Sequence, residues 1–327
     1  MITMLQEELI QHGIGDTILT HSRNTEKLLN LNNIYLKFEG GNPTGTMKDR
    51  AAYACLKVAR ERGFDSLAIA SCGNFGASFV YMSRIFDMIP HVFIPKSYHT
   101  PRIAEMERRG GVIHRVPGTY EDAVMHSAKE AGERGWFNAN PGFEPNKSAS
   151  IEAYATISYE IYQRLGCAPD FVAVPIGNGT TIAGVHRGFK DLLEEDRIGS
   201  LPILLGGSTT GGNPVVKCLR EGSRTIVNLE PKEIVETDHN EPLVSWICLD
   251  GQEALDALWE SGGWATYVSD EELLRYSDIL AGEEGLLVLP ASCASLAAIV
   301  RYVKEKEPER DQRCVAVLTG RRFQQPT

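Results

Sequence analysis

The sequence of 327 residues predicts an α/β protein with mostly parallel sheets that helices cover on both faces. From residue 66 onward, short apolar runs rich in β-branched residues alternate with longer amphipathic stretches of helical period. Turn residues and capping pairs lie at junctions between them. The chain is long enough to bury a substantial core in one large domain or in two moderate ones.

The first half opens with an extended segment at residues 34–38, followed by a turn rich in Gly, Asn and Pro. A helix is expected from Asp49 to Arg62, and Thr119 with Asp122 forms a capping pair for a later helix. The other strands expected in this half are residues 67–70, 91–94 and 112–116, and the other helices are residues 76–86, 101–109 and 120–135.

The second half continues the alternation, with Ser269 and Glu272 opening a capping box. Strands are expected at residues 171–176, 202–205, 265–268, 286–289 and 314–318, and helices at residues 149–165, 181–194, 252–260 and 292–305. Residues 206–241 are rich in turn residues and show no clear period. A stretch rich in Pro, Gly and Asn at residues 138–147 marks the expected domain boundary.

Composition narrows the functional class. The net charge of −10 and the absence of a basic block argue against nucleic-acid binding. No apolar run approaches the length of a membrane span, so no membrane partner is expected. The seven cysteines are far apart and form no CxxC pair, which indicates reduced thiols and no metal site. We therefore expect a soluble cytoplasmic enzyme.

The most informative motif is the run from Phe38 to Arg50, in which a Gly/Asn/Pro turn delivers Lys48 to a helix start. The positive partial charge at a helix N-terminus disfavours a second positive charge. Lys48 should therefore lose its proton more easily, and a neutral amine can form a Schiff base. Taken alone, the motif also fits a solvated surface lysine.

The second motif, from Ser71 to Gly76, follows one expected strand and precedes a helix. Backbone amides and small side chains converge there, which suits a carboxylate or a phosphate. Asn74 adds a side-chain donor for a phenolate-type oxygen. A turn without a ligand is the alternative.

The third motif, from Pro175 to Gly184, lies at another strand-to-helix junction. Its glycines let the backbone approach an anion, and Thr180 and Thr181 add hydroxyl donors. Ile182 stands where a dinucleotide fingerprint has its third glycine, so that fingerprint is excluded. A glycine-rich turn with a threonine cap is the alternative.

The fourth motif is Thr319, which follows the last expected strand. Ligands of open α/β sheets bind outside the carboxyl ends of the strands. Read alone, Thr319 also fits a residue that hydrogen-bonds at a strand end.

In this order, the four motifs resemble the pyridoxal-phosphate enzymes of fold type II, the tryptophan-synthase β-subunit fold. Within that group the chain is most similar to threonine synthases, over nearly its whole length. The run from Asn42 to Arg50 is close to the family's lysine motif, and residues 71–76 are close to its substrate-carboxylate loop. Residues 260–265, 268–272 and 290–295 also resemble its second half.

The resemblance implies two three-layer domains: residues 47–145 form the smaller one, and residues 1–46 with 146–327 form the larger one that anchors the cofactor. It also implies that the chain is a homodimer that acts on a small amino acid. Lys48 would form the internal aldimine with pyridoxal phosphate and then act as general base.

Further roles follow from the same resemblance. Asn74 would bond the cofactor's ring hydroxyl, and Thr319 would face its pyridine nitrogen. The residues implied for the phosphate are Gly177, Asn178, Gly179, Thr180 and Thr181, and those for the substrate carboxylate are Ser71, Cys72, Gly73, Asn74 and Phe75. A threonine at the ring nitrogen leaves it largely unprotonated, which suits elimination and replacement better than transamination.

Three departures bear on the substrate. Cys72 stands where threonine or serine is usual, and Leu289 stands where threonine synthases commonly carry glutamate. The run from Asn140 to Lys147 lacks the arginine that helps threonine synthases bind the phosphate of O-phosphohomoserine. Lys147 supplies only a point charge there, without a bidentate contact.

The leading hypothesis is elimination or replacement on O-phosphohomoserine or a related amino acid. Because residues 140–147 and 177–182 are also similar to cysteine synthases, a β-replacing enzyme of that type is the alternative, as is a serine/threonine ammonia-lyase. A binding protein that keeps the fold without catalysis is a third class, which the intact Lys48 and Asn74 disfavour.

Overall fold

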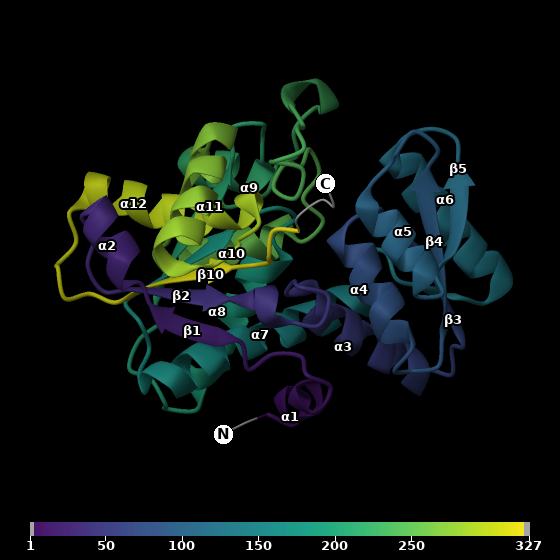
Figure 1. Cartoon of the computed structure of the whole chain (residues 1–327), viewed down its shortest axis with the longest axis horizontal. Coiled ribbons are helices and arrows are strands. Elements are labelled where there is room, and N and C mark those ends of the chain that lie inside the picture. Colours follow the sequence, from purple (N-terminus) through teal and green to yellow (C-terminus); the bar gives the residue numbers. More distant parts are fainter. Residues whose placement is uncertain (1–2, 324–327) are drawn as a thin grey trace. The chain divides into compact units, whose positions relative to one another are not determined.

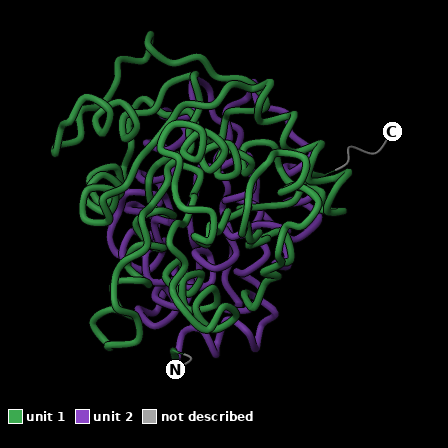
Figure 2. The backbone as a smooth tube through the Cα atoms, turned by 90° about the vertical axis from the view of Figure 1, so that its left-hand side faces the viewer, with its two compact units in different colours: residues 1–3, 15–41, 154–324 green, residues 4–14, 42–153, 325–327 purple. Residues whose placement is uncertain are grey.

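The computed structural model describes residues 3–323, and the chain forms two compact units (Figure 2). The larger unit contains residues 15–41 and 154–323. The smaller unit contains residues 4–14 and 42–153. Each unit is built on its own sheet, and the elements are labelled in Figure 1.

The smaller unit has a four-stranded, fully parallel sheet in the order β5-β4-β3-β6. Its strands are β3 (Ser66–Ala70), β4 (Ile89–Pro95), β5 (Val112–Val116) and β6 (Phe137–Asn138). Its helices are α1 (Met4–Gln11), α3 (Lys48–Glu61), α4 (Asn74–Ser83), α5 (Pro101–Arg108), α6 (Tyr120–Arg134) and the start of α7 (Asn146–Leu165). Helix α4 follows β3 directly in the chain. The loop from Ser71 to Gly76 therefore lies at the carboxyl edge of a parallel sheet, which is where such sheets bind ligands.

The larger unit has a six-stranded sheet in the order β1-β2-β10-β7-β8-β9, in which only the edge pair β1–β2 is antiparallel. Its strands are β1 (Ile18–His21), β2 (Ile34–Phe38), β7 (Phe171–Pro175), β8 (Ile203–Thr209), β9 (Trp264–Val268) and β10 (Cys314–Leu318). Its helices are α2 (Arg23–Leu29), η1 (Glu39–Gly41), α8 (Thr180–Glu194), α9 (Pro214–Arg220), η2 (Pro231–Glu233), α10 (Gly251–Glu260), α11 (Asp270–Glu284), η3 (Pro290–Cys293), α12 (Ala294–Lys306) and the rest of α7.

Both faces of the larger sheet are covered. Phe171 and Ala173 of β7 belong to a core cluster with residues of α12, such as Leu296. Val172 and Val174 point to the opposite face, and they are equally buried. Full burial of consecutive strand residues is what helices on both faces of a parallel sheet require, so the α/β fold class with mostly parallel sheets is confirmed.

Most expected elements are confirmed, and one expected strand is wrong. Residues 286–289 form no strand: only Val288 makes an isolated antiparallel bridge, to Arg321. Its burial explains the apolar run, because Val288 is fully buried in the core beside α11 without any strand pairing. The capping boxes at Thr119 and Ser269 are both present.

The division of the chain differs from the sequence-based boundaries at two places. Helix α1 belongs to the smaller unit because Leu9 and Ile14 are buried in that unit's core. The Pro/Gly/Asn stretch at 138–147 also lies inside the smaller unit, where Asn140 accepts a hydrogen bond from the Ala70 amide at 2.9 Å. The chain passes from the smaller unit to the larger one after residue 153, within α7.

No helix among residues 3–323 is both long enough and apolar enough to cross a membrane. In the same part of the chain, no cluster of three or more His, Cys, Asp or Glu side chains has the arrangement of a metal site. All seven cysteines are free thiols.

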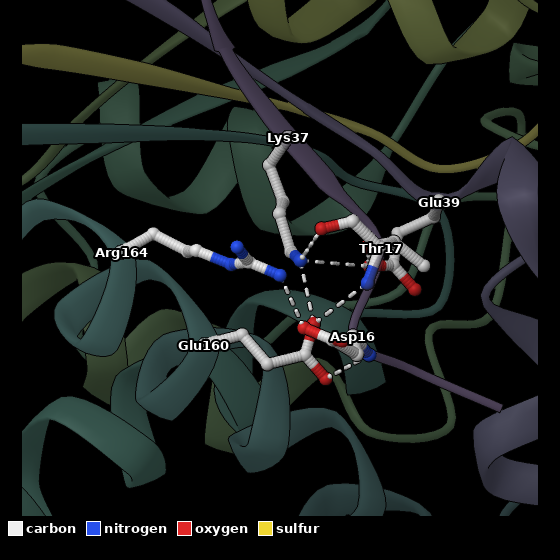
Figure 3. Close-up of polar contacts among 6 residues, drawn as sticks. All are labelled: Asp16, Thr17, Lys37, Glu39, Glu160 and Arg164. Atoms are coloured by element: carbon white, nitrogen blue, oxygen red, sulfur yellow. Dashed lines mark hydrogen bonds and ion pairs between the residues drawn. The ribbon is translucent and has the colours of Figure 1, made fainter. Parts of the chain in front are cut away.

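A buried ion pair joins the two segments of the larger unit (Figure 3). The Nζ atom of Lys37 on β2 lies 2.5 Å from Oε2 of Glu160 on α7 and donates to the Thr17 carbonyl at 2.9 Å. Glu160 also accepts hydrogen bonds from the amides of Asp16 and Thr17. Lys37 and Glu160 are 0% and 2% exposed, so water contributes almost nothing to their solvation.

We predict that Lys37→Met lowers the free energy of unfolding by about 3–5 kcal/mol, because it removes the cation that pairs with the buried Glu160 carboxylate. Urea unfolding followed by tryptophan fluorescence, to which Trp264 in β9 contributes, measures the loss. Lys27→Met is the matched control, since Lys27 is exposed on α2. Equal stability of the two variants would contradict the prediction.

The smaller unit carries a histidine pair on neighbouring strands. Nδ1 of His91 on β4 lies 3.0 Å from Nε2 of His114 on β5, and the His91 ring stacks on Trp136 with 3.7 Å between centroids. Burial, the nearby His114 and Arg134 lower the pKa of His91 to about 4, although Glu130 opposes the shift. Burial also lowers the pKa of His114. Both rings are therefore neutral in the folded protein near pH 7.

We predict that the smaller unit loses stability as the pH falls from about 6.5 toward 4. In this window the unfolded chain binds a proton at residue 91 that the folded chain does not, so unfolding is favoured. The loss is about 1–2 kcal/mol after allowance for solvent at the partly exposed ring. Urea unfolding followed by tryptophan fluorescence and circular dichroism at several pH values measures it. His91→Gln should flatten this dependence, whereas His99→Gln, at an exposed site, should leave it unchanged.

Candidate active site

Lys48 is the first residue of α3, which begins one residue before the expected start at Asp49. Its side chain is partly buried, and its Nζ atom lies 5.8 Å from the centre of the Phe75 ring. The Lys48 amide donates to the Thr46 hydroxyl at 3.0 Å. The lysine loop, which we define as residues 42–48, thus brings its amine close to the start of α4, where the second motif lies.

The lysine loop is closed by the residue that follows it. The buried Asp49 carboxylate accepts hydrogen bonds from the amide and the hydroxyl of Thr44, at 2.7 and 2.6 Å. Burial raises the pKa of Asp49, although the hydrogen bonds from Thr44 and the nearby Ser78 and Arg102 oppose the shift. The Asp49 carboxylate therefore folds the loop back so that Lys48 is held at the helix start.

The loop from Ser71 to Gly76 is held by one hydroxyl. Ser71 accepts hydrogen bonds from the amides of Gly76 and Gly73, at 3.0 and 3.4 Å. A Cβ atom at Gly76 would lie 2.6 Å from the Ser71 carbonyl, so only glycine fits there, whereas one at Gly73 would meet nothing within 4 Å. The space beside Gly73 is open at the N-terminus of α4, where a carboxylate is favoured.

Asn74 is the first residue of α4, two residues before the expected helix start. Its Oδ1 accepts a hydrogen bond from Nε of Arg102 at 3.0 Å. Cys72 is partly buried, and its carbonyl accepts the Thr100 hydroxyl proton at 2.7 Å. The smaller unit therefore places Lys48, Asn74 and the residues of the carboxylate loop around the starts of α3 and α4.

In the larger unit, the third motif joins β7 to α8. Gly179 is the N-cap residue of α8 with φ of 100°, which side chains rarely adopt. Thr181 is buried in the first turn of this helix, while Asn178 is exposed. Backbone amides at a helix N-terminus, together with the Thr181 hydroxyl, form a donor set that fits a phosphate dianion.

Residues 242–250 support this loop from behind. A Cβ atom at Gly177 would lie 2.4 Å from the Pro242 carbonyl. Asp250 donates its amide to the Asn178 carbonyl at 3.2 Å, and its carboxylate accepts the hydroxyl proton of Thr180. Since a hydroxyl has one proton, the Thr180 hydroxyl is directed toward Asp250, and its oxygen is left as an acceptor.

Thr319 follows β10, and its Oγ1 atom lies 2.7 Å from the Oγ atom of Ser292 in η3. One of the two hydroxyls donates its proton to the other, so Ser292 restricts how the Thr319 hydroxyl turns. Thr319 is partly buried, and Ser292 is fully buried.

Three of these contacting residues, Arg102, Asp250 and Ser292, were not predicted from the sequence. Arg102 could have been recognised in the sequence, because a cation in the first turn of a helix opposes the helix dipole and requires a compensating partner. No local pattern marks Asp250 or Ser292, since each contacts a residue at least 27 positions away.

The chain matches the sequence model of one known family over residues 10–320. That family is described as "Pyridoxal-phosphate dependent enzyme". The protein belongs to this family. It is a pyridoxal-phosphate-dependent enzyme of fold type II, as the motifs predict.

Curated relatives give the same grouping. The chain is 31% identical to the threonine synthase of Methanocaldococcus jannaschii over 314 residues, which cover 95% of this chain and 76% of that protein. It is 30% identical to the threonine synthase of Halalkalibacterium halodurans over 319 residues, which cover 97% and 85%. The chain is thus threonine-synthase-like in sequence.

Solved structures share the fold at low identity. Serine racemase from maize superposes with a TM-score of 0.80 at 16% identity, covering 98% of this chain and 93% of that one. The processed threonine deaminase isoform 2 of Solanum lycopersicum gives 0.79 at 19% identity, with 97% and 90% covered. At these identities the similarity shows the fold alone.

We predict that Gly177→Ala weakens binding of pyridoxal phosphate at least about tenfold, or about 1.4 kcal/mol. The added methyl group must displace the loop from the Pro242 carbonyl, 2.4 Å away. Titration of the cofactor-free protein with pyridoxal phosphate measures the effect, and circular dichroism checks the fold. Gly199→Ala is the control, because a Cβ atom there meets nothing within 4 Å. Unchanged affinity in Gly177→Ala would refute the assignment of the loop.

Proposed function

We propose that the protein catalyses elimination or replacement on an amino acid, with O-phosphohomoserine or a close relative as substrate and a threonine-type product. The observation that carries the proposal is its similarity to threonine synthases over 95% of the chain. The arrangement of Lys48 at the start of α3 supports it.

In this proposal Lys48 carries the cofactor as a Schiff base. Asn74 would donate to the ring oxygen, and Thr319 would lie beside the ring nitrogen. The phosphate is held by Gly177, Asn178, Gly179, Thr180 and Thr181. The amides and the Thr181 hydroxyl are its donors, since the Thr180 hydroxyl faces Asp250. The proposed substrate loop belongs to the smaller unit, residues 4–14 and 42–153, and the proposed phosphate loop belongs to the larger unit.

The substrate carboxylate is proposed to lie at the N-terminus of α4. Ser71 and Cys72 frame the loop, and the open space beside Gly73 admits the carboxylate. The amides of Asn74 and Phe75 then act as its donors, with the positive end of the helix dipole behind them. The Phe75 ring, near Lys48, covers the amine on one side.

Pyridoxal phosphate, when bound, supplies the electron sink for deprotonation at the amino acid's α-carbon. The Lys48 amine, when it is not attached to the cofactor, would accept that proton as general base. A hydroxyl at Thr319, in place of a carboxylate, leaves the ring nitrogen without a counter-ion. This keeps the sink weak and favours loss or exchange of a side-chain substituent over transamination.

We predict that Lys48→Ala abolishes turnover, because both the covalent attachment and the general base are lost. Borohydride reduction followed by mass spectrometry of the peptide containing residue 48 measures the attachment. Lys129→Ala, at an exposed position of α6, should keep both activity and attachment. Turnover by Lys48→Ala at the unmodified rate would disprove the role of Lys48.

Substrate class is tested by supplying O-phosphohomoserine, serine, threonine, O-acetylserine and O-phosphoserine to the purified protein. Threonine and phosphate formed from O-phosphohomoserine would establish the proposed reaction. Activity confined to the three-carbon substrates would favour a β-replacing enzyme of the cysteine-synthase type, and ammonia release from serine or threonine would favour an ammonia-lyase. Residues 140–147 lack the arginine expected for binding the substrate phosphate, so the result with O-phosphohomoserine decides most directly between these reactions.

We also propose that the enzyme is a cytoplasmic homodimer. The family resemblance motivates this proposal, and the free thiols agree with a reducing compartment. Sedimentation equilibrium of the purified chain, of 36.1 kDa, distinguishes monomer from dimer.

A further inference from the structure

Arg102 is a buried cation in an unfavourable place. It is the second residue of α5 and is 8% exposed. The positive partial charges of a helix N-terminus repel a cation there, and burial removes water from its guanidinium group. Burial lowers the pKa of Arg102, although Glu105 and Asp49 oppose the shift. Such a position is tolerated only where specific contacts compensate for it.

The guanidinium group donates to three different segments of the smaller unit. Its Nε donates to Oδ1 of Asn74 at 3.0 Å, and its Nη2 donates to the carbonyl of Thr44 at 3.0 Å. Its Nη1 pairs with Oε2 of Glu105, one turn along α5, at 2.6 Å. The planar fork is rigid, so these contacts hold the lysine loop and the start of α4 in one arrangement.

The contact with Arg102 determines which way the Asn74 amide faces. An arginine side chain has donors and no acceptor, so only the oxygen of the Asn74 amide can face it. The Nδ2 group therefore lies on the opposite side of the amide and is presented as a donor. Without Arg102, the Asn74 amide is free to rotate so that its oxygen, not its Nδ2 group, faces the ring oxygen of the cofactor. Two acceptors would then face each other, and no hydrogen bond would form.

We infer that Arg102 is a positioning residue for the cofactor. It fixes the Asn74 amide so that Nδ2 donates to the ring oxygen of pyridoxal phosphate, and it ties that amide to the lysine loop through Thr44. This inference rests on the proposed function for the role of Asn74. Arg102 thus acts on the cofactor through Asn74.

Arg102 can be replaced without leaving its ion-pair partner unpaired. Glu105, the ion-pair partner of Arg102, also pairs with Arg109 at 3.1 Å, so Arg102→Gln does not leave its carboxylate without a cation. Arg108→Gln is the matched control, because Arg108 is exposed on the same helix.

The test is a double-mutant cycle on the affinity of the full chain for pyridoxal phosphate, after the cofactor is removed with hydroxylamine. We expect Arg102→Gln and Asn74→Ala each to weaken binding about tenfold. The double variant should lose less affinity than the two single losses added together, because part of the effect of Arg102 on the cofactor passes through Asn74, while its contact with Thr44 acts on the lysine loop. Arg108→Gln should bind as the unmodified chain does.

A second readout separates positioning from folding. Removing a positive charge and a fixed donor near the ring oxygen should raise the pH midpoint of the bound cofactor's absorption in Arg102→Gln. Arg102→Lys keeps the charge but not the fork, so its midpoint should shift less and its affinity should fall about threefold. If Arg102→Gln does not fold, Arg102→Lys takes its place in the cycle.

The outcomes distinguish the two proposals. If the unmodified chain takes up pyridoxal phosphate at Lys48 but Arg102→Gln binds it equally well, the inference about Arg102 is wrong. It is also wrong if the losses from Arg102→Gln and Asn74→Ala add in the double variant. If the unmodified chain itself fails to attach the cofactor at Lys48, the proposed function fails first.

Discussion

The buried contact between Lys37 and Glu160 is the constraint on which the larger unit depends. It joins residues 123 positions apart, and both side chains are almost completely shielded from water. A charge in that environment is stable only when its partner is in place. The pair therefore locks β2 to α7 while β10 pairs with β2 in the sheet. Because β2 leads through η1 directly into the lysine loop, the chain enters the loop from a fixed strand.

Helix starts that follow strands carry the groups that we propose to bind anions. Helices α4 and α8 each begin a few residues after a parallel strand, and α3 begins after the lysine loop. Each helix brings the positive partial charge of its N-terminus to the place where the preceding strand and loop end. One such start suits the substrate carboxylate, another suits the phosphate, and the third presents Lys48. The proposed site thus uses three helix N-termini, those of α3, α4 and α8.

Polar side chains around these helix starts hold them in shape. Asp49 closes the lysine loop through Thr44, and Ser71 closes the loop before α4. Asp250 binds the hydroxyl of Thr180, and Ser292 contacts Thr319. Each supporting group is buried or partly buried, where a hydrogen bond is strengthened and an unmet one is costly. This shell narrows the directions in which the functional groups can point.

The sequence by itself determined the fold class, most element positions, both capping boxes and the cofactor family. These follow from local periodicity, from residues at adjacent positions and from short motifs such as the lysine run ending at Arg50. The expected strand at 286–289 failed because an apolar run reports burial, and Val288 is buried without strand pairing.

Only the tertiary structure decided which groups support the site. The contact of Arg102 with Asn74 spans 28 positions, that of Asp250 with Thr180 spans 70, and that of Lys37 with Glu160 spans 123. No local pattern encodes such pairs, because each depends on where two separate elements meet after the core has packed. The sequence thus indicated the residues that we propose to react, and long-range packing decided how their atoms are oriented.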